Sequence, residues 1–276
     1  MFRFFRKSRE KTLAENPSDR KGLAKKYRKY TFYVVGEIFI VIIGILLALQ
    51  VDNWNNQLED RQEAQVFLIR LKNEFLTNRK QLVQKVTMRE KALKSTRELL
   101  RFVDGNPEGL RASQIDSLLA NALPVYTFDP SLGVLNQLTS TDKLTLIQSE
   151  ALNDKLSIWD AMIEDFKEDE NMYNDYNHNQ FRPFLYKNYT ARNIINTRIR
   201  NRVIEPILLS NPNDVNTEIG FSGQSVNVTA LQNSMEFENY LAFCVSWLSL
   251  INTQSQGILN YIDSVVEIID EELEAD

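Results

Sequence analysis

The sequence is poor in the side chains that most often carry chemistry, with one cysteine, Cys244, and one histidine, His178. A lone cysteine cannot form an intramolecular disulfide, so an exported domain would depend on burial of its core. A nucleophile with a histidine base would have to use His178, and no serine or cysteine stands beside it. P-loop, G-x-S-x-G and H-E-x-x-H motifs are also missing. We therefore expect no enzyme activity and no cofactor.

Asp175 and His178 are the nearest approach to a metal motif. They place a carboxylate and an imidazole three residues apart, which is half of the pattern that di-iron helical bundles use. Such a site needs a second histidine, which the chain lacks. We expect His178 to lie on the surface and no metal to bind.

Glycine and proline are absent from the 60 residues between Ile45 and Asp104. Leu, Gln, Lys, Arg and Glu are frequent there, and these residues favour helix. The turn-forming sequence Asp104-Gly105-Asn106-Pro107 follows. The pattern predicts one long helix with a single apolar stripe, in steps of three, four and seven, at Leu68, Leu71, Phe75, Leu82, Val86, Leu93 and Leu100.

A long apolar run precedes this helix. It extends from Tyr30 to Val51 and contains one charged residue, Glu37. About 20 such residues span a bilayer as a helix. A cleaved signal peptide would have a shorter apolar core and a small-x-small cleavage site, whereas this run ends in Ala48-Leu49-Gln50-Val51. The run predicts an uncleaved anchor that continues into the next helix as a rod of ~70 residues, about 105 Å long.

Charge predicts the orientation of the anchor. Eleven Lys and Arg against three acids give residues 1–30 a net charge of +8, and since the whole chain is at −5, residues 31–276 carry −13. Cations next to a span stay in the cytoplasm. We expect a basic cytoplasmic tail (1–29), a transmembrane helix (30–51) and a periplasmic domain (52–276) in a bacterial inner membrane. The first residues, with Phe2, Phe4 and Phe5 among cations, form either a short amphipathic segment on the inner leaflet or a disordered tail.

Residues 52–276 are predicted to be all-α, and we expect their helices to form a single antiparallel bundle. We expect short helices capped by Ser113 and Ser131, a helix from near Ser149 that ends before Pro183, and a segment near Ala191–Leu209 interrupted by Pro206. Residues 210–233 read as a surface loop, with a short β-hairpin as an option. The helix from Ser149 has heptad positions Leu152, Leu156, Trp159, Ile163, Phe166 and Tyr173. The last helix has a coiled-coil stripe at Phe237, Leu241, Cys244, Leu248, Ile251, Ser255, Ile258, Ile262, Val265 and Ile269.

Several segments together resemble a known family. The sequence resembles uncharacterised single-span bacterial envelope proteins that share a GEI…IGI…ALQ…NWN signature. The segments that carry the resemblance are the basic FFRK-like start, Gly36-Glu37-Ile38, Ile43–Gln50, Asn53–Asn55, Phe128–Leu138 and Lys143–Leu156. Asp142 departs from the family, which more often has glycine at this turn. The resemblance implies the topology and a helical outer part, and it carries no established activity.

Glu37 is the candidate functional residue of the span. A carboxylate inside a span costs roughly 2.5–3.5 kcal/mol at the bilayer centre, and less near an end, where Glu37 lies. Three interpretations remain open: a protonated or hydrogen-bonded residue, for example to Tyr33 of a neighbouring copy; a contact to a partner span; or an ion-coupling site. Gly36, Gly44 and Ala48 recur at helical spacing near Glu37 and would let spans approach closely, although glycine is also simply common in spans.

The ends of the span carry interface residues. Trp54 and Tyr30 are expected to anchor the helix at the two membrane surfaces. Asn53 and Asn55 either hydrogen-bond across an oligomer or face lipid headgroups.

Two charged runs could bind partners, cations at the acidic one and anionic glycan or lipid at the basic one. Such runs are more often solvated or paired with each other. The acidic run is Glu164, Asp165, Glu168, Asp169 and Glu170, and the basic run is Arg192, Arg198, Arg200 and Arg202.

Three functions remain open at this point. The first is a homo-oligomeric scaffold or interaction protein anchored in the inner membrane, with the bilayer, further copies and other envelope proteins as partners and no nucleic acid. The second is a subunit of an ion-coupled complex or channel that uses Glu37, by analogy with energy-coupling subunits of similar layout. The third is a sensor that binds a small ligand in the outer bundle.

Overall fold

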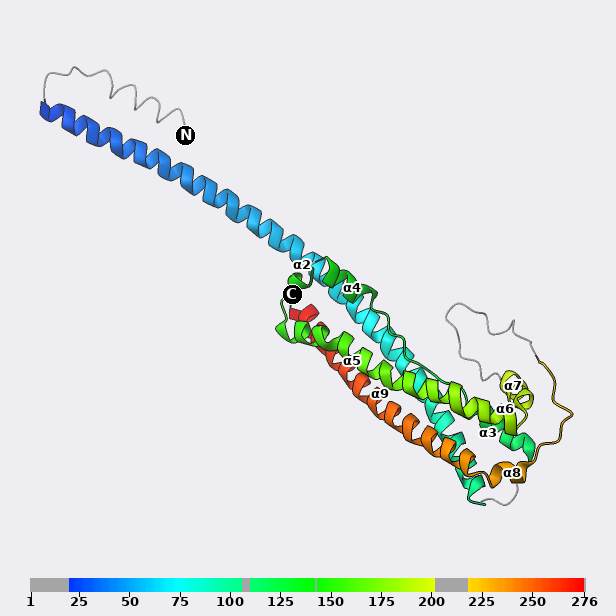
Figure 1. Ribbon diagram of the computed structural model, residues 1–276. Helices are drawn as coiled ribbons and strands as arrows, with labels where there is room; N and C mark the ends of the chain where they lie inside the picture. Colours follow the sequence, from blue (N-terminus) through cyan, green and yellow to red (C-terminus); the bar gives the residue numbers. More distant parts are fainter. Residues whose placement is uncertain (1–19, 106–109, 142, 202–217, 276) are drawn as a thin grey trace. The chain divides into compact units, whose positions relative to one another are not determined.

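All regular structure in the part of the chain that is described is helical. The computed structural model describes residues 20–105, 110–141, 143–201 and 218–275 (Figure 1). The chain divides into two units, Met1–Glu63 and Ala64–Asp276. The elements are α2 (Arg20–Val103), α3 (Ala112–Ala122), α4 (Gly133–Ser140), the 3₁₀ turn η1 (Lys143–Leu146), α5 (Glu150–Tyr176), the π-helical turn η2 (Asn177–Phe181), α6 (Arg182–Asn188), α7 (Ala191–Arg200), α8 (Val228–Gln232) and α9 (Met235–Ala275).

Helix α2 runs without a break from Arg20 to Val103, which confirms the long helix expected from the lack of glycine and proline. It ends where the turn sequence begins. The Gly105 amide donates to the Phe102 carbonyl at 3.0 Å, and Gly105 has φ 77°, a backbone region that favours glycine. Asn106 and Pro107 lie outside the described residues.

The predicted apolar stripe of α2 packs against the core of the second unit, with full burial in its first part and partial burial in its second. Leu68, Leu71, Phe75 and Leu82 are buried as expected. Val86, Leu93 and Leu100 are partly buried and pack against the same core, so the predicted stripe faces the core in its second half as well. In this half α2 also buries polar side chains, which the pattern of apolar residues did not indicate. The buried positions after Leu82 include Arg89, Ala92, Thr96 and Leu99.

Helices α5 and α9 bury the residues that the heptad pattern predicted. All ten α9 positions from Phe237 to Ile269 are buried. The six α5 positions are buried too, and Glu170 fills the gap of seven residues between Phe166 and Tyr173. The Trp159 ring of α5 joins the three long helices, since its centroid lies 4.9 Å from that of Phe75 on α2 and 5.9 Å from that of Tyr261 on α9.

Contacts between the long helices give their directions. On α2 and α9 the partners are Lys72 with Asp270, Arg79 with Asp263 and Arg89 with Ser255. Residue numbers rise on one helix while they fall on the other, so α9 runs opposite to α2. The pairs Lys155 with Tyr261 and Tyr176 with Tyr240 place α9 opposite to α5 as well.

Helices α2 and α5 run in the same direction, because Phe75 contacts Trp159 and, further along both helices, Arg89 pairs with Glu170. The arrangement therefore differs from a bundle with strictly alternating directions. The cause is the stretch that follows α3, residues 123–141, which we call the return segment: it runs back along α2 before α5 begins. Its contacts with α2 are Tyr126 with Arg89, Ser131 with Asn78, Val134 with Glu74 and Gln137 with Arg70.

The two predicted helix caps, Ser113 and Ser131, were both wrong. Helix α5 begins next to Ser149 as expected, and Ser149 is its N-cap, accepting from the Leu152 amide at 3.3 Å. Helix α3 starts at Ala112, one residue before Ser113, with Arg111 at the N-cap. Helix α4 is not capped by Ser131: the Glu74 carboxylate of α2 accepts from the Val134 amide at 2.9 Å. A carboxylate from another helix thus satisfies the first turn of α4.

Helix α5 ends before Pro183 as expected, although the chain remains helical across this proline in two further elements. Helix α5 ends at Tyr176, the π turn follows, and Pro183 lies in the first turn of α6, where its missing amide hydrogen costs little. The described part of the predicted loop, 218–233, holds α8 and no strand, so the hairpin option is not supported there. Pro206 and residues 210–217 lie outside the described residues.

Candidate functional site

The apolar run lies in the first unit as an exposed stretch of α2. This helix is the one in the described residues that is long and apolar enough to cross a membrane, and none of its apolar window is buried. Phe32 is 72% exposed and Leu46 is 58% exposed. A core helix of a soluble protein of similar composition would instead bury such side chains. The segment is therefore a possible membrane anchor.

The predicted contact residues of the span are all exposed. Glu37, Gly36, Gly44 and Ala48 face outward, and Tyr33 is 49% exposed. A Cβ atom built on Gly36 or Gly44 would have no neighbour within 4 Å. Contacts within the chain therefore do not require glycine at either position.

The predicted interface residues flank the apolar run. Tyr30, Trp54, Asn53 and Asn55 are exposed. The Asn55 amide donates to Glu59 Oε1 at 2.9 Å, one turn further along α2. This contact uses one donor of Asn55. The proposed roles of Asn53 and Asn55 at headgroups or in an oligomer stay predictions.

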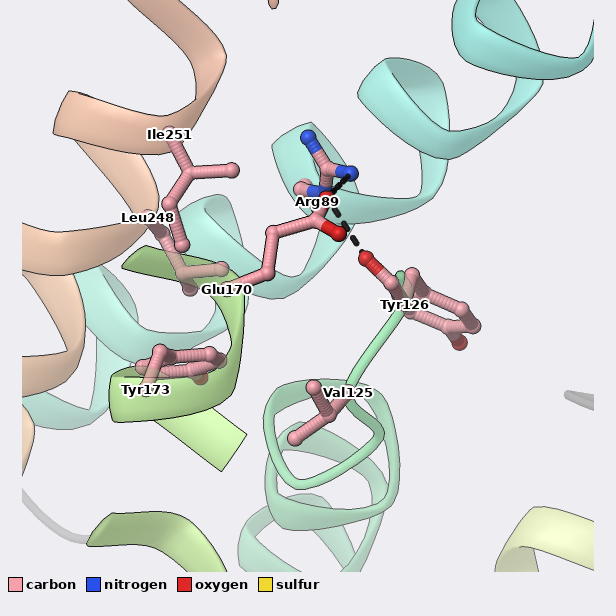
Figure 2. A pocket seen from close by; sticks show the side chains of 7 residues that line it. All are labelled: Arg89, Val125, Tyr126, Glu170, Tyr173, Leu248 and Ile251. Atoms are coloured by element: carbon pink, nitrogen blue, oxygen red, sulfur yellow. Dashed lines mark hydrogen bonds and ion pairs between the residues drawn. The ribbon is translucent and has the colours of Figure 1, made fainter. Parts of the chain in front are cut away.

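The second unit contains a buried polar centre that the sequence did not point to. Arg89 of α2 is 1% exposed and uses its guanidinium on three elements. It pairs with Glu170 of α5 and donates to the Tyr126 carbonyl of the return segment at 3.0 Å (Figure 2). It also donates to Ser255 Oγ of α9 at 2.8 Å. The guanidinium carbon also lies 5.6 Å from the centre of the Phe166 ring.

Glu170 is held from the other side by the backbone. The Phe128 amide donates to its Oε2 at 2.9 Å, while Oε1 faces Arg89. Burial raises the pKa of Glu170 to about 7, although the charge of Arg89 and this amide oppose the rise. Burial likewise lowers the pKa of Arg89 and of half-buried Lys85 nearby. For Glu170 and Arg89, burial therefore affects the pKa more than their mutual attraction does.

The geometry of this centre supports a structural role. Arg89, Glu170, Tyr173, Val125, Tyr126, Leu248 and Ile251 line a depression that leaves no room for a water molecule (Figure 2). A substrate could not enter without opening the helices. The arrangement can fix the mutual register of α2, α5, α9 and the return segment, because each contributes a hydrogen-bonding partner.

A sequence signal for this centre exists in the heptads. Arg89 and Glu170 lie at positions where the 3–4 period continues but the apolar residue is missing, and Ser255 is the polar member of the α9 stripe. Periodicity therefore could have placed all three inside. It could not show that the three residues meet, since Arg89 is 81 residues from Glu170 and 166 residues from Ser255 in the sequence.

Part of each charged run is engaged within the chain, whereas Glu164, Asp165 and Glu168 are exposed. Glu170 is buried, and Asp169 accepts from the Gln254 amide of α9. Arg192 donates to the Ile219 and Gly220 carbonyls, and Arg200 lies 3.8 Å from Glu218. The basic run thus holds the segment that follows residue 217. Arg202 lies outside the described residues.

His178 is exposed in the π turn. Its Nδ1 lies 3.0 Å from Asn174 Oδ1 and its Nε2 lies 3.0 Å from Arg182 Nη1. Within the described residues no three His, Cys, Asp or Glu side chains are grouped so that they could hold a metal.

Cys244 supplies a test of the closed core. The thiol is buried against α5, and burial raises its pKa to about 12. Because the thiolate is the reactive form, we expect alkylation of the folded protein by N-ethylmaleimide at pH 8 to be at least about 100-fold slower than in denaturant. An added exposed cysteine at Ile158 serves as the positive control. Rapid labelling of Cys244 in the folded protein would contradict the closed core.

Comparison with known proteins gives a match to one family model. Residues 37–159 are similar to a family of unknown function, DUF6090. The matched stretch runs from Glu37 to Trp159, and so includes most of the apolar run, the outer part of α2, and the return segment. This agrees with the expected resemblance to an uncharacterised family, whereas the transmembrane signature and the bacterial envelope stay predictions. No curated protein and no solved structure matches the chain significantly.

Proposed function

We propose that the protein is a non-enzymatic interaction or scaffold protein, anchored by α2 in a bacterial inner membrane with its N-terminus in the cytoplasm and residues 52–276 in the periplasm. The observation that carries the proposal is the exposed apolar run from Tyr30 to Val51. The charge of +8 on residues 1–30 supports the orientation. The closed core of the second unit supports binding at the surface.

Self-association through the span is the second part of the proposal. Gly36, Gly44 and Ala48 are exposed, and no neighbour among the described residues occupies the space beside either glycine. Small residues at helical spacing let two spans approach closely. Glu37 on the same side would then find a hydrogen-bond partner in another copy, for example Tyr33.

Native mass spectrometry of the full chain in mild detergent tests this. We expect a defined oligomer for the natural chain and mostly monomer for Gly44→Ile, because a branched side chain holds two helices apart at this face. Leu46→Phe adds bulk on the opposite face and serves as the control that keeps the oligomer. A natural chain that is monomeric would remove the self-association part and leave the anchor.

Ion coupling is the alternative favoured by Glu37, the sole carboxylate of an otherwise apolar run. Glu37→Gln separates the two functions. A scaffold keeps its location and loses at most some of its oligomer. A coupling subunit assembles normally and loses ion-dependent function.

A further inference from the structure

A second apolar stripe of α2 faces solvent in the unit that begins at Ala64. Val66, Ile69, Leu76 and Val83 are 55%, 50%, 40% and 39% exposed, in steps of three, seven and seven. Asn73 and Lys80, both exposed, occupy the positions between them. The six residues alternate in steps of three and four, which is the period of a coiled-coil contact. We call them the outer stripe.

None of the residues that the structure describes buries the outer stripe. On one side of the stripe, Lys72 and Arg79 of α2 form ion pairs with Asp270 and Asp263 of α9. On the other side Arg70 donates to Gln137 of α4 at 2.8 Å. The charges on either side of the stripe thus have partners inside the chain, and the apolar positions between them are left for another molecule.

The period of the outer stripe specifies the kind of partner. A stripe with steps of three and four is complemented by a helix with the same steps. Another copy of α2 has this pattern and the same length. Asn73 lies where a coiled coil places an inward position, and an asparagine there favours a parallel pair in which it meets its own equivalent. Lys80 at the next such position lowers the stability of the contact.

The sequence links the stripe to the span. The three- and four-residue spacing of the outer stripe continues from Val66 back into the apolar run, with two successive steps of four on either side of Gln62. The positions on this line before Gln62 are Leu58, Asn55, Val51, Ala48, Gly44 and, seven residues earlier, Glu37. Two chains anchored in one membrane have the same orientation, so identical residues of the two stripes come opposite each other. A different protein would need a span and an extramembrane helix with the same spacing of contact residues.

We propose that the outer stripe is the extramembrane half of a parallel contact between two copies of this chain. The inference rests on the proposed self-association of the span. It adds that α2 is both a core helix of its own bundle and one helix of an intermolecular helix pair.

Same-residue disulfide formation in native membranes tests the proposal. Ile69→Cys and Leu76→Cys should each give a linked dimer under mild oxidation, because disulfides form where Cα atoms lie within about 7 Å. Ile158→Cys on α5 is the matched control, since Ile158 is an exposed apolar residue (54%) outside the stripe. Native Cys244 is buried and should not react. We expect at least roughly tenfold more dimer at the stripe positions than at Ile158.

A third cysteine separates the possible failures. Ala48→Cys reports the span contact. Linking at Ala48 without linking at Ile69 and Leu76 overturns the outer contact and leaves the span proposal intact. No linking at any position, with a monomer in native mass spectrometry, overturns both. Equal linking at Ile158 or a linked product with another protein also overturns the proposal.

Discussion

Arg89→Ala should lower the free energy of unfolding by about 3–5 kcal/mol, because it leaves the Glu170 carboxylate buried without its counterion. Ser255 and the Tyr126 carbonyl lose a donor in the same step. Chemical denaturation of the full chain in detergent, followed by far-UV circular dichroism, measures the loss. Arg79→Ala is the control: its pair with Asp263 is half exposed and should contribute less than about 1 kcal/mol. An equal loss for both variants would contradict the role of the buried centre.

Removing both charges should restore most of the stability. Arg89→Met combined with Glu170→Met replaces the pair by apolar side chains of similar volume, and such exchanges are often neutral or stabilising. The pH dependence should change as well. Burial raises the pKa of Glu170 from 4.5 to about 7, so the folded state binds the extra proton in this window. The contribution of Glu170 to stability therefore falls as pH rises from 4.5 to about 7. The double variant should lack this slope.

Ile42→Arg combined with Leu46→Arg should release the protein from the membrane. Each arginine near the centre of a span costs about 2.5–3.5 kcal/mol on insertion scales, and two on one helix make the segment too polar to insert. The measurement is the fraction of protein retained in membranes after washing with alkaline carbonate. We expect most of the natural chain and little of the variant to remain in the pellet.

The control for this experiment places the same charges on exposed apolar residues of α2 outside the apolar run. Val66→Arg with Ile69→Arg should leave membrane retention unchanged, since both residues are exposed and lie outside the apolar run. Retention of the Ile42/Leu46 variant at the level of the natural chain would show that the run is not the anchor. The proposed function would then have to be abandoned.

The sequence by itself determined the features that depend on local pattern. The lack of glycine and proline predicted α2, since nothing interrupts its backbone hydrogen bonds from Ile45 to Val103. The α9 heptad from Phe237 to Ile269 predicted every buried position of that stripe, because one helix face packs against the core throughout. The apolar run was legible for the same reason, as its length and composition are local properties.

Only the tertiary structure decided where the polar side chains of the core find partners. Arg89, Glu170 and Ser255 come from three helices and meet because the return segment lets α5 run in the same direction as α2. Glu74 replaces the expected Ser131 cap of α4 for the same reason. A sequence pattern reports the face on which a residue lies, whereas the hydrogen-bond partner of a buried polar group depends on the packing of distant segments.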